Sequence, residues 1–261
     1  MGALCHHALE LTGLAGDPAS RVHALDPRAK VVGLVAVTVI AVSAPPARWP
    51  VYAACLLVLA AYAAAARVRP GEAWRRARIV LPLVLAVALF VPLVRTGGRT
   101  WSLGPLTIHE AGLVVLAGVA AKATIGTLSA VLLGATTTFP AVLRALEAMR
   151  VPRLLVLVAA FMYRYLFVIV AEVGRMRAAL AARAYRPRHL LHAAALGRMS
   201  TALFLRTYAR GERVYLAMLS RGYRGGTPHL TPLRFRQADA VFVAGVLALL
   251  VAVRAGVEVA A

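Results

Sequence analysis

Residues 49–66 read WPVYAACLLVLAAYAAAA and contain no charged side chain. A helix needs about 20 mostly apolar residues to cross the hydrocarbon core of a bilayer, so this stretch is close to the required length. The rest of the chain shares its character, since 61% of the 261 residues are hydrophobic. Soluble domains contain only about 45–50% apolar residues. The sequence therefore predicts an all-α fold, a polytopic helical membrane protein with long cytoplasmic helices.

Further apolar stretches are spread along the chain. Those predicted to cross the membrane are 31–44, 79–94, 111–134 and 240–253. Residues 154–171 are equally apolar but are interrupted by Arg164. A short amphipathic helix is predicted to begin near Pro140, with an apolar face made of Val142, Leu143, Leu146 and Met149. The four stretches predicted to cross the membrane and residues 49–66 together give five crossings, with six as the alternative.

The arginines determine the predicted orientation. The chain has 30 Lys and Arg residues against 10 Asp and Glu, which gives a formal net charge of +20. They lie between and after the apolar stretches, as in the cytoplasmic loops of membrane proteins, so a nucleic-acid partner is not predicted. Residues 67–78 and 172–237 are predicted to be cytoplasmic and 95–110 to be external. A full crossing at 154–171 would put 172–237 outside, so 154–184 is predicted to be one long helix, partly embedded, with both ends on the cytoplasmic side.

The predicted organisation has three parts. Residues 1–134 hold the N-terminal segment and transmembrane helices 1–4. Residues 135–237 hold the cytoplasmic helices with two arginine motifs, and residues 238–261 hold a C-terminal transmembrane helix. Because the middle part keeps helical periodicity and many apolar residues, it is predicted to be folded rather than disordered.

Motifs for catalysis or metal binding are not found in the sequence. It has neither a Gly-rich phosphate loop nor an Asp-rich pair for Mg²⁺-diphosphate chemistry. Cys5, His6 and His7 are adjacent and cannot easily converge on one ion, while His189 and His192 are typical of a solvated helix. The sequence therefore predicts a non-catalytic protein with no cofactor and no metal site.

Two ionisable residues fall inside apolar stretches. Lys122 and Arg164 are by default functional candidates, because a charge in the membrane is costly. They could also extend their charged ends to the membrane surface or pair with a carboxylate such as Glu110 or Glu172. These alternatives stay open.

A short motif occurs twice. The two copies are Ala182-Arg183-Ala184-Tyr185-Arg186 and Ser220-Arg221-Gly222-Tyr223-Arg224. Each follows a long helical stretch and precedes a helix breaker, Pro187 or Gly225-Gly226. The pattern predicts an arginine at each helix C-terminus, flanked by small residues that let a partner approach. A guanidinium can bind a carboxylate or helix-end carbonyls through its planar donors. Two ordinary helix caps are the alternative, but a cap does not require Tyr-Arg after each.

Several stretches resemble one transporter family. Leu25-Asp26-Pro27-Arg28-Ala29-Lys30 resembles the Asp-Pro-Arg-x-Lys signature of energy-coupling-factor T components. Three further stretches resemble the cobalt branch of these components, the CbiQ family. They are Met162-Tyr163-Arg164-Tyr165-Leu166, Phe204-Leu205-Arg206-Thr207-Tyr208 and Ser220-Arg221-Gly222-Tyr223. The resemblance covers residues 15 to 250, and its strength lies in the order of the motifs together with the matching hydropathy.

The resemblance implies a T component, a multi-pass protein of the bacterial inner membrane. Ala182-Arg183-Ala184 and Ser220-Arg221-Gly222 would then dock on two cytoplasmic ATPase subunits, although Ala184 departs from the Gly of the family motif. A separate substrate-binding membrane subunit would carry the ion. The resemblance favours cobalt, with a nickel or vitamin transporter as the alternative.

Two other classes are weighed against this one. A membrane enzyme acting on anionic lipid or diphosphate substrates would use the arginines as phosphate ligands, but it would also need catalytic carboxylates or a metal. A stand-alone secondary carrier would typically show repeated halves. The sequence has neither feature.

Overall fold

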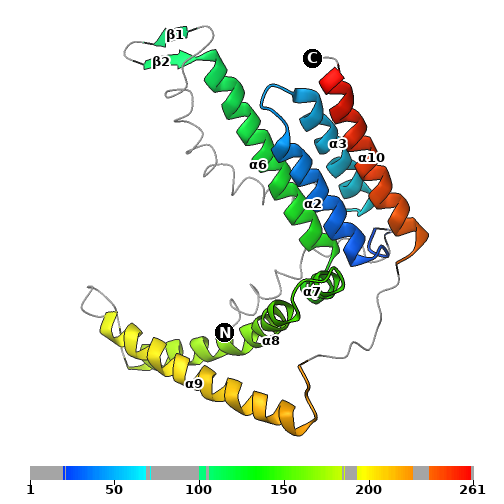
Figure 1. Ribbon diagram of the computed structural model, residues 1–261. Helices are drawn as coiled ribbons and strands as arrows, with labels where there is room; N and C mark the ends of the chain where they lie inside the picture. The colour runs from blue at the N-terminus through cyan, green and yellow to red at the C-terminus, as the bar shows by residue number, and fades with distance from the viewer. Residues whose placement is uncertain are drawn as a thin grey trace. The chain divides into compact units, whose positions relative to one another are not determined.

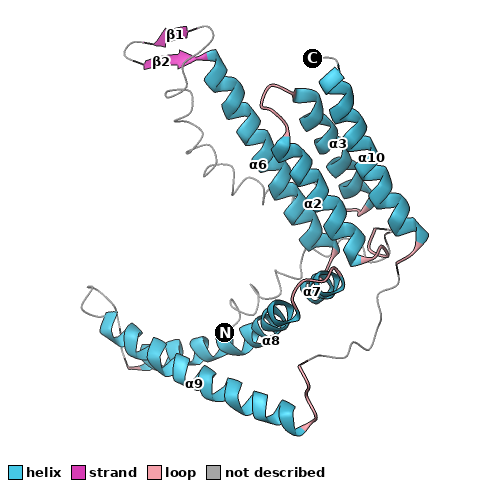
Figure 2. Ribbon diagram, viewed as in Figure 1, coloured by secondary structure: helices cyan, strands magenta, loops and turns pink. Residues whose placement is uncertain are grey.

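The computed structural model describes residues 20, 22–68, 71, 100–103, 106–183, 185, 193–225 and 235–259. Within these ranges the chain forms seven helices and one two-stranded hairpin (Figures 1 and 2). The predicted helical membrane fold is therefore confirmed. The hairpin, which hydropathy alone does not predict, pairs β1 (Thr100–Leu103) antiparallel with β2 (Leu106–His109).

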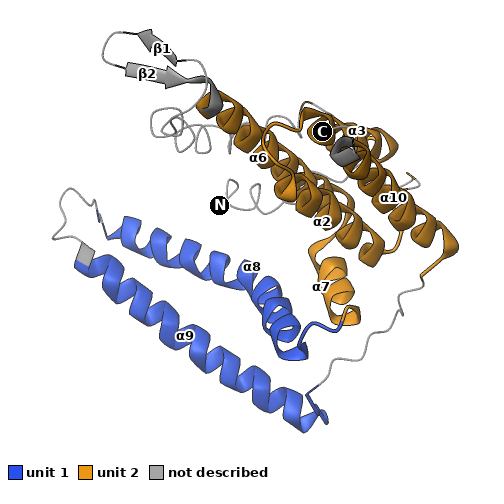
Figure 3. Ribbon diagram, turned by 45° about the horizontal axis from the view of Figure 1, so that its top comes forward, with its two compact units in different colours: residues 1–13, 150–232 blue, residues 14–149, 233–261 orange. Residues whose placement is uncertain are grey.

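The chain divides into two compact units (Figure 3). We call residues 14–149 and 233–261 the bundle unit. It contains α2 (Pro27–Ser43), α3 (Trp49–Ala65), α6 (Glu110–Thr136), α7 (Phe139–Ala148) and α10 (Gln237–Val259). The other unit includes residues 150–232, with α8 (Arg153–Ala182) and α9 (Ala193–Ser220), and we call it the arm unit. The predicted borders at 134 and 237 stay predictions.

Helix α2 is central in the bundle unit. It packs against α3, α6, α7 and α10, and α3 in turn packs against α6 and α10. The core is apolar and includes Val37, Tyr52, Cys55, Leu59, Ile125, Leu132 and Leu250. A small residue allows one close approach: a Cβ on Gly118 of α6 would lie 2.9 Å from the Cβ of Pro46 in the α2–α3 loop. Close packing through small residues is the usual way in which helices associate in lipid.

Helix α7 begins as predicted but buries a different face. Its N-cap is Thr138 and Pro140 lies in its first turn. The buried residues are Ala141, Leu143 and Ala145, whereas Met149 is 44% exposed. Of the predicted apolar face, Leu143 is buried, Val142 and Leu146 are partly buried, and Met149 is exposed. The helix packs on α2 through small side chains, and a search for large apolar residues does not find such a surface.

Three helices are long and apolar enough to cross a membrane, judged by length and composition in the described part of the chain. These are Gly112–Thr136, Arg153–Ala182 and Gln237–Gly256, and Trp49–Ala65 is a shorter apolar helix. Helix α8 is one continuous element of 30 residues, in agreement with the predicted long helix. The stretch 79–94 lies outside the described residues, and so does most of the link 67–78. The number of crossings stays a prediction.

Candidate functional site

The first arginine motif ends α8. Arg183 is the C-cap residue, and its backbone N–H donates to the carbonyl of Leu180 at 3.1 Å. The N–H of Tyr185 donates to the same carbonyl, also at 3.1 Å. Ala182 is the last helical residue, and Ala184 lies outside the described residues. Tyr185 therefore folds back on the last turn and closes the helix end.

The second motif ends α9 in the same way. The N–H groups of Arg221 and Tyr223 both donate to the carbonyl of Met218, at 3.1 and 3.0 Å, and the N–H of Gly222 donates to Leu219 at 2.9 Å. Gly222 has a φ of 79°, in the left-handed region. This combination of bonds is the Schellman motif, in which Gly usually provides the left-handed residue.

The two helix ends therefore share more than sequence. In each helix end, the Tyr two residues after the Arg donates its backbone N–H to the carbonyl of the residue three positions before that Arg. Arg183 and Arg221 thus occupy equivalent positions, both exposed. Within the described residues, neither guanidinium has a hydrogen-bonding partner. The arrangement leaves two planar cationic groups available at the ends of two long helices. It accounts for the Gly after Arg221, which has a positive φ, but it gives no reason for the Tyr side chain.

Gly222→Val is expected to disrupt the second helix end. A β-branched residue with positive φ is strained by about 1–2 kcal/mol, so the cap should open and Arg221 should lose its fixed position. Thermal unfolding in detergent should show the loss of stability. Gly222→Asn should be tolerated, because Asn also adopts this conformation.

The matched control for this substitution is Gly211→Ala. Gly211 lies inside α9 with open space around it, so Ala there should be neutral or stabilising by up to about 1 kcal/mol. Equal behaviour of Gly222→Val and Gly211→Ala would contradict the assigned cap.

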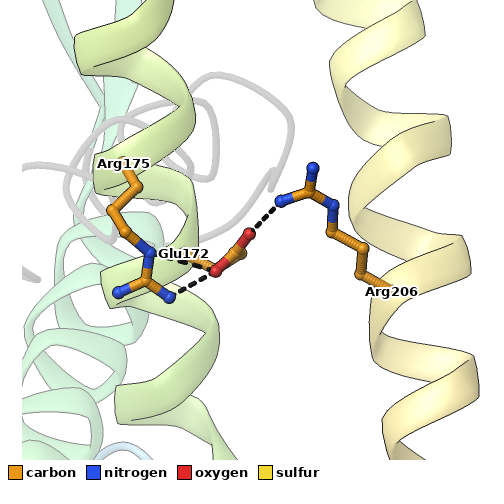
Figure 4. A network of polar contacts seen from close by, with 3 residues as sticks. All are labelled: Glu172, Arg175 and Arg206. Carbon is orange, nitrogen blue, oxygen red and sulfur yellow. Dashed lines mark hydrogen bonds and ion pairs between the residues drawn. The ribbon is translucent and has the colours of Figure 1, made fainter.

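An ion-pair network joins α8 to α9 (Figure 4). The carboxylate of Glu172 accepts hydrogen bonds from Arg175, one turn along α8, and from Arg206 of α9. The Nε of Arg175 is 3.2 Å from the same carboxylate. The Glu172 side chain is only 17% exposed, so it lies between the helices. One carboxylate therefore links the two helices of the arm unit.

Lys122 and Arg164 are the two ionisable residues inside apolar stretches. Within the arm unit Glu172 pairs with Arg175 and Arg206, and its suggested pairing with Lys122 or Arg164 stays a prediction. The Lys122 ammonium donates to the carbonyl of Val42, in the last turn of α2, at 2.8 Å. A cation is favourable there, at the negative end of the helix dipole. Arg164 is exposed on α8, and the side chain of Glu110 lies outside the described residues.

The family-signature residues form the start of α2. Asp26 is its N-cap, and the Asp26 carboxylate accepts the N–H of Arg28 at 2.9 Å. Pro27 occupies the first helical position, where its missing N–H is not needed. Asp26 is 6% exposed, which is rare for a carboxylate. The signature therefore starts a helix whose first turn includes the buried residues Ala29 and Lys30.

Lys30 extends this start into the bundle. It is 2% exposed, and its ammonium donates to the carbonyls of His23 at 3.2 Å and Thr136 at 3.1 Å. Thr136 is the last residue of α6, where backbone carbonyls lack a partner within the helix. The lysine therefore joins the start of α2 to the end of α6.

Asp239 completes the group and is missed by the sequence analysis. It is 2% exposed, and its carboxylate accepts the N–H of Asp26 at 2.7 Å and the N–H of Arg236 at 2.7 Å. The second bond resembles a capping box at the start of α10. The only signal in the sequence is a single acid at the start of the last apolar stretch. We call Asp26, Lys30, Thr136 and Asp239 the corner network.

The described ranges contain no group of three or more His, Cys, Asp or Glu residues that could hold a metal ion. Cys5, His6, His7, His189 and His192 lie outside these ranges. The chemistry that the described residues offer is thus binding through exposed guanidiniums, together with internal hydrogen bonding between helix ends.

A family model and two relatives match this chain. Residues 18–233 match the family model described as CbiQ, cobalt transport protein. A protein of Methanocorpusculum labreanum named as a fused cobalt transport protein, CbiMQ, is 27% identical over 237 residues, which cover 85% of this chain and 39% of that protein. An uncharacterized protein of Methanocaldococcus jannaschii is 31% identical over 115 residues, which cover 44% of this chain and 39% of that protein. The chain spans less than half the length of both relatives.

Proposed function

The chain belongs to the CbiQ family of cobalt transport proteins, and we propose that it is the transmembrane coupling subunit, the T component, of an energy-coupling-factor importer for cobalt. In this proposal two cytoplasmic ATPase subunits bind the ends of α8 and α9, and a separate membrane subunit binds the substrate. The chain transmits the movement of the ATPases into the membrane.

The observation that carries the proposal is the repeated helix end at Arg183 and Arg221. Two equivalent arginines on two long helices suit two equivalent partners, because each can enter a groove and bind a carboxylate or helix-end carbonyls there. The small residues next to each Arg leave room for the partner's backbone. The Glu172 network ties α8 to α9, and paired helices transmit a displacement better than separate ones.

The charge distribution supports a cytoplasmic location for the ends of α8 and α9. The stretch 172–237 is rich in arginine, and such stretches are retained on the cytoplasmic side. The protein would therefore be a multi-pass protein of the cell membrane, with the ends of α8 and α9 in the cytoplasm. Cobalt as the cargo is supported by the family and by the name of the Methanocorpusculum labreanum relative.

Reconstitution in proteoliposomes tests the proposal. The purified chain alone should neither hydrolyse ATP nor take up Co²⁺, because its sequence has no phosphate loop and its described residues form no ligand cluster. Together with the ATPase subunits and the substrate-binding membrane subunit, it should support ATP-dependent Co²⁺ uptake. Ni²⁺ and a vitamin serve as competing substrates that identify the branch. ATP hydrolysis by the chain alone, persisting through further purification, would contradict the proposal.

A further inference from the structure

Two members of the corner network, Thr136 and Asp239, are near in sequence to the two links that connect the arm unit with the bundle unit. Helix α8 follows α7 after the short link 149–152, and two residues separate Thr136 from the start of α7. Helix α9 is followed by the link 221–236, which leads into the first turn of α10 and Asp239. Along the chain, the connection from α8 reaches Thr136 through the ten residues of α7, and the connection from α9 leads directly into the first turn of α10, which contains Asp239.

The network binds these two entry points to a single helix start. Lys30 holds the Thr136 carbonyl at the α6–α7 corner, and the N–H of Asp26 donates to the carboxylate of Asp239 at the start of α10. Asp26 is the N-cap of α2 and Lys30 lies in its first turn. The last residue of α6 and the first turn of α10 are therefore both bonded to the start of α2. The bonded residues are 106 positions apart for Lys30 and Thr136 and 213 positions apart for Asp26 and Asp239.

Stability alone is a weak reason to bury these charges. Moving a charge out of water costs several kcal/mol even after relaxation, and well-packed apolar residues often hold helices together equally well or better. Hydrogen bonds, by contrast, fix the relative position of three helix ends in a way that apolar contacts do not. Lys30 has three ammonium hydrogens, and both of its described acceptors are backbone carbonyls.

We propose that the corner network is the joint through which movement of α8 and α9 enters the membrane bundle, with Lys30 and Asp239 as its positioning residues. This inference rests on the proposed function. If the ATPase subunits displace α8 and α9, the connection between α6 and α7 and the start of α10 move together only while the network is intact. Without the network, α8 displaces α7 and α9 displaces α10 independently, and the bundle unit does not move as one body.

The signature of a broken joint is uncoupling rather than disassembly. Arg183 and Arg221 belong to the arm unit and remain available to the ATPases when the network is altered. ATP binding and hydrolysis should then continue, while the movement no longer reaches the substrate-binding partner.

The test uses Lys30→Met and Asp239→Asn in the full complex in proteoliposomes. Lys30→Met keeps an unbranched side chain but removes both hydrogen bonds. Asp239→Asn keeps only one acceptor oxygen, so it cannot accept from both Asp26 and Arg236. In each variant we expect normal association with the ATPases and ATP hydrolysis within about twofold of the wild type, while Co²⁺ taken up per ATP hydrolysed falls about tenfold or more, in the range of coupling between distant sites.

Lys122→Met is the matched control. Lys122 also donates to a backbone carbonyl of α2, that of Val42, but at the opposite end of the helix. It should leave the ratio of uptake to hydrolysis close to that of the wild type. A fall of the same size in Lys122→Met would overturn the inference, because any lost lysine bond would then have this effect.

The remaining outcomes are also decisive. An unchanged ratio in both network variants overturns the inference, and so does loss of both variants from the membrane, since the network would then only hold the fold. If the wild-type complex shows no ATP-dependent uptake, the proposed function fails first. If the wild type transports and the variants keep its ratio, only the inference fails.

Discussion

Replacing both Arg183 and Arg221 with Ala should abolish transport while the chain still inserts into the membrane. Each Arg is the exposed residue at a helix end, so its removal takes away a contact for a partner rather than any packing. In the proposed complex both ATPase subunits would lose their anchor. Co-purification with the ATPases and Co²⁺ uptake by the reconstituted complex are the measurements.

The single variants should lose only part of the activity. An exposed ion pair contributes about 0–1 kcal/mol, whereas removing one partner from a buried pair costs about 3–5 kcal/mol. A groove at the membrane surface should lie between these limits. Lys at either position should restore function incompletely, because it keeps the charge but lacks the planar guanidinium.

Arg198→Ala is the matched control for these variants. Arg198 is an exposed arginine of α9, and its Nε donates only weakly to the carbonyl of Ala194 in its own helix, at 3.4 Å. It should have little effect on assembly. If Arg198→Ala impairs association as much as Arg183→Ala or Arg221→Ala, the arginines act collectively as a basic surface, and the docking assignment is wrong.

The helix ends could be predicted because their signals are local. Pro140 marks the start of α7, and Gly225-Gly226 follows the end of α9 closely. The repeated Arg-small-Tyr pattern led to the two C-cap positions for the same reason, since a Schellman motif is specified by a few neighbouring residues.

The corner network could not be predicted, because its partners are far apart in the sequence. Asp26 and Asp239 are separated by 213 residues, and the N–H that joins them is a backbone group with no sequence signature. Lys122 was ambiguous for a similar reason. Its acceptor is the backbone carbonyl of Val42, and a search for opposite charges finds only carboxylates. Backbone groups at helix ends are thus the partners that sequence patterns leave out.

Charge reversal at Glu172 should weaken the contact between α8 and α9. Glu172→Arg removes the only described acceptor of the bonds from Arg175 and Arg206 and places three guanidiniums where the helices meet. Like charges at this position should repel, so α8 and α9 should no longer move together. We expect Co²⁺ uptake by the complex to fall about tenfold, a typical size for coupling between distant sites, while the chain still inserts into the membrane.

The swapped pair Glu172→Arg with Arg206→Glu should recover most of this loss. The new carboxylate on α9 would accept from position 172 on α8, so the interhelical pair is restored with opposite polarity, and the double variant measures the pairwise interaction. Glu212→Arg is the control, since it makes the identical charge change at an exposed position of α9. Recovery in the swap with a neutral control would assign the effect to the pair. A swap as poor as Glu172→Arg alone would mean that Glu172 acts through something other than Arg206, and the two helices would then have to be held together by their partners.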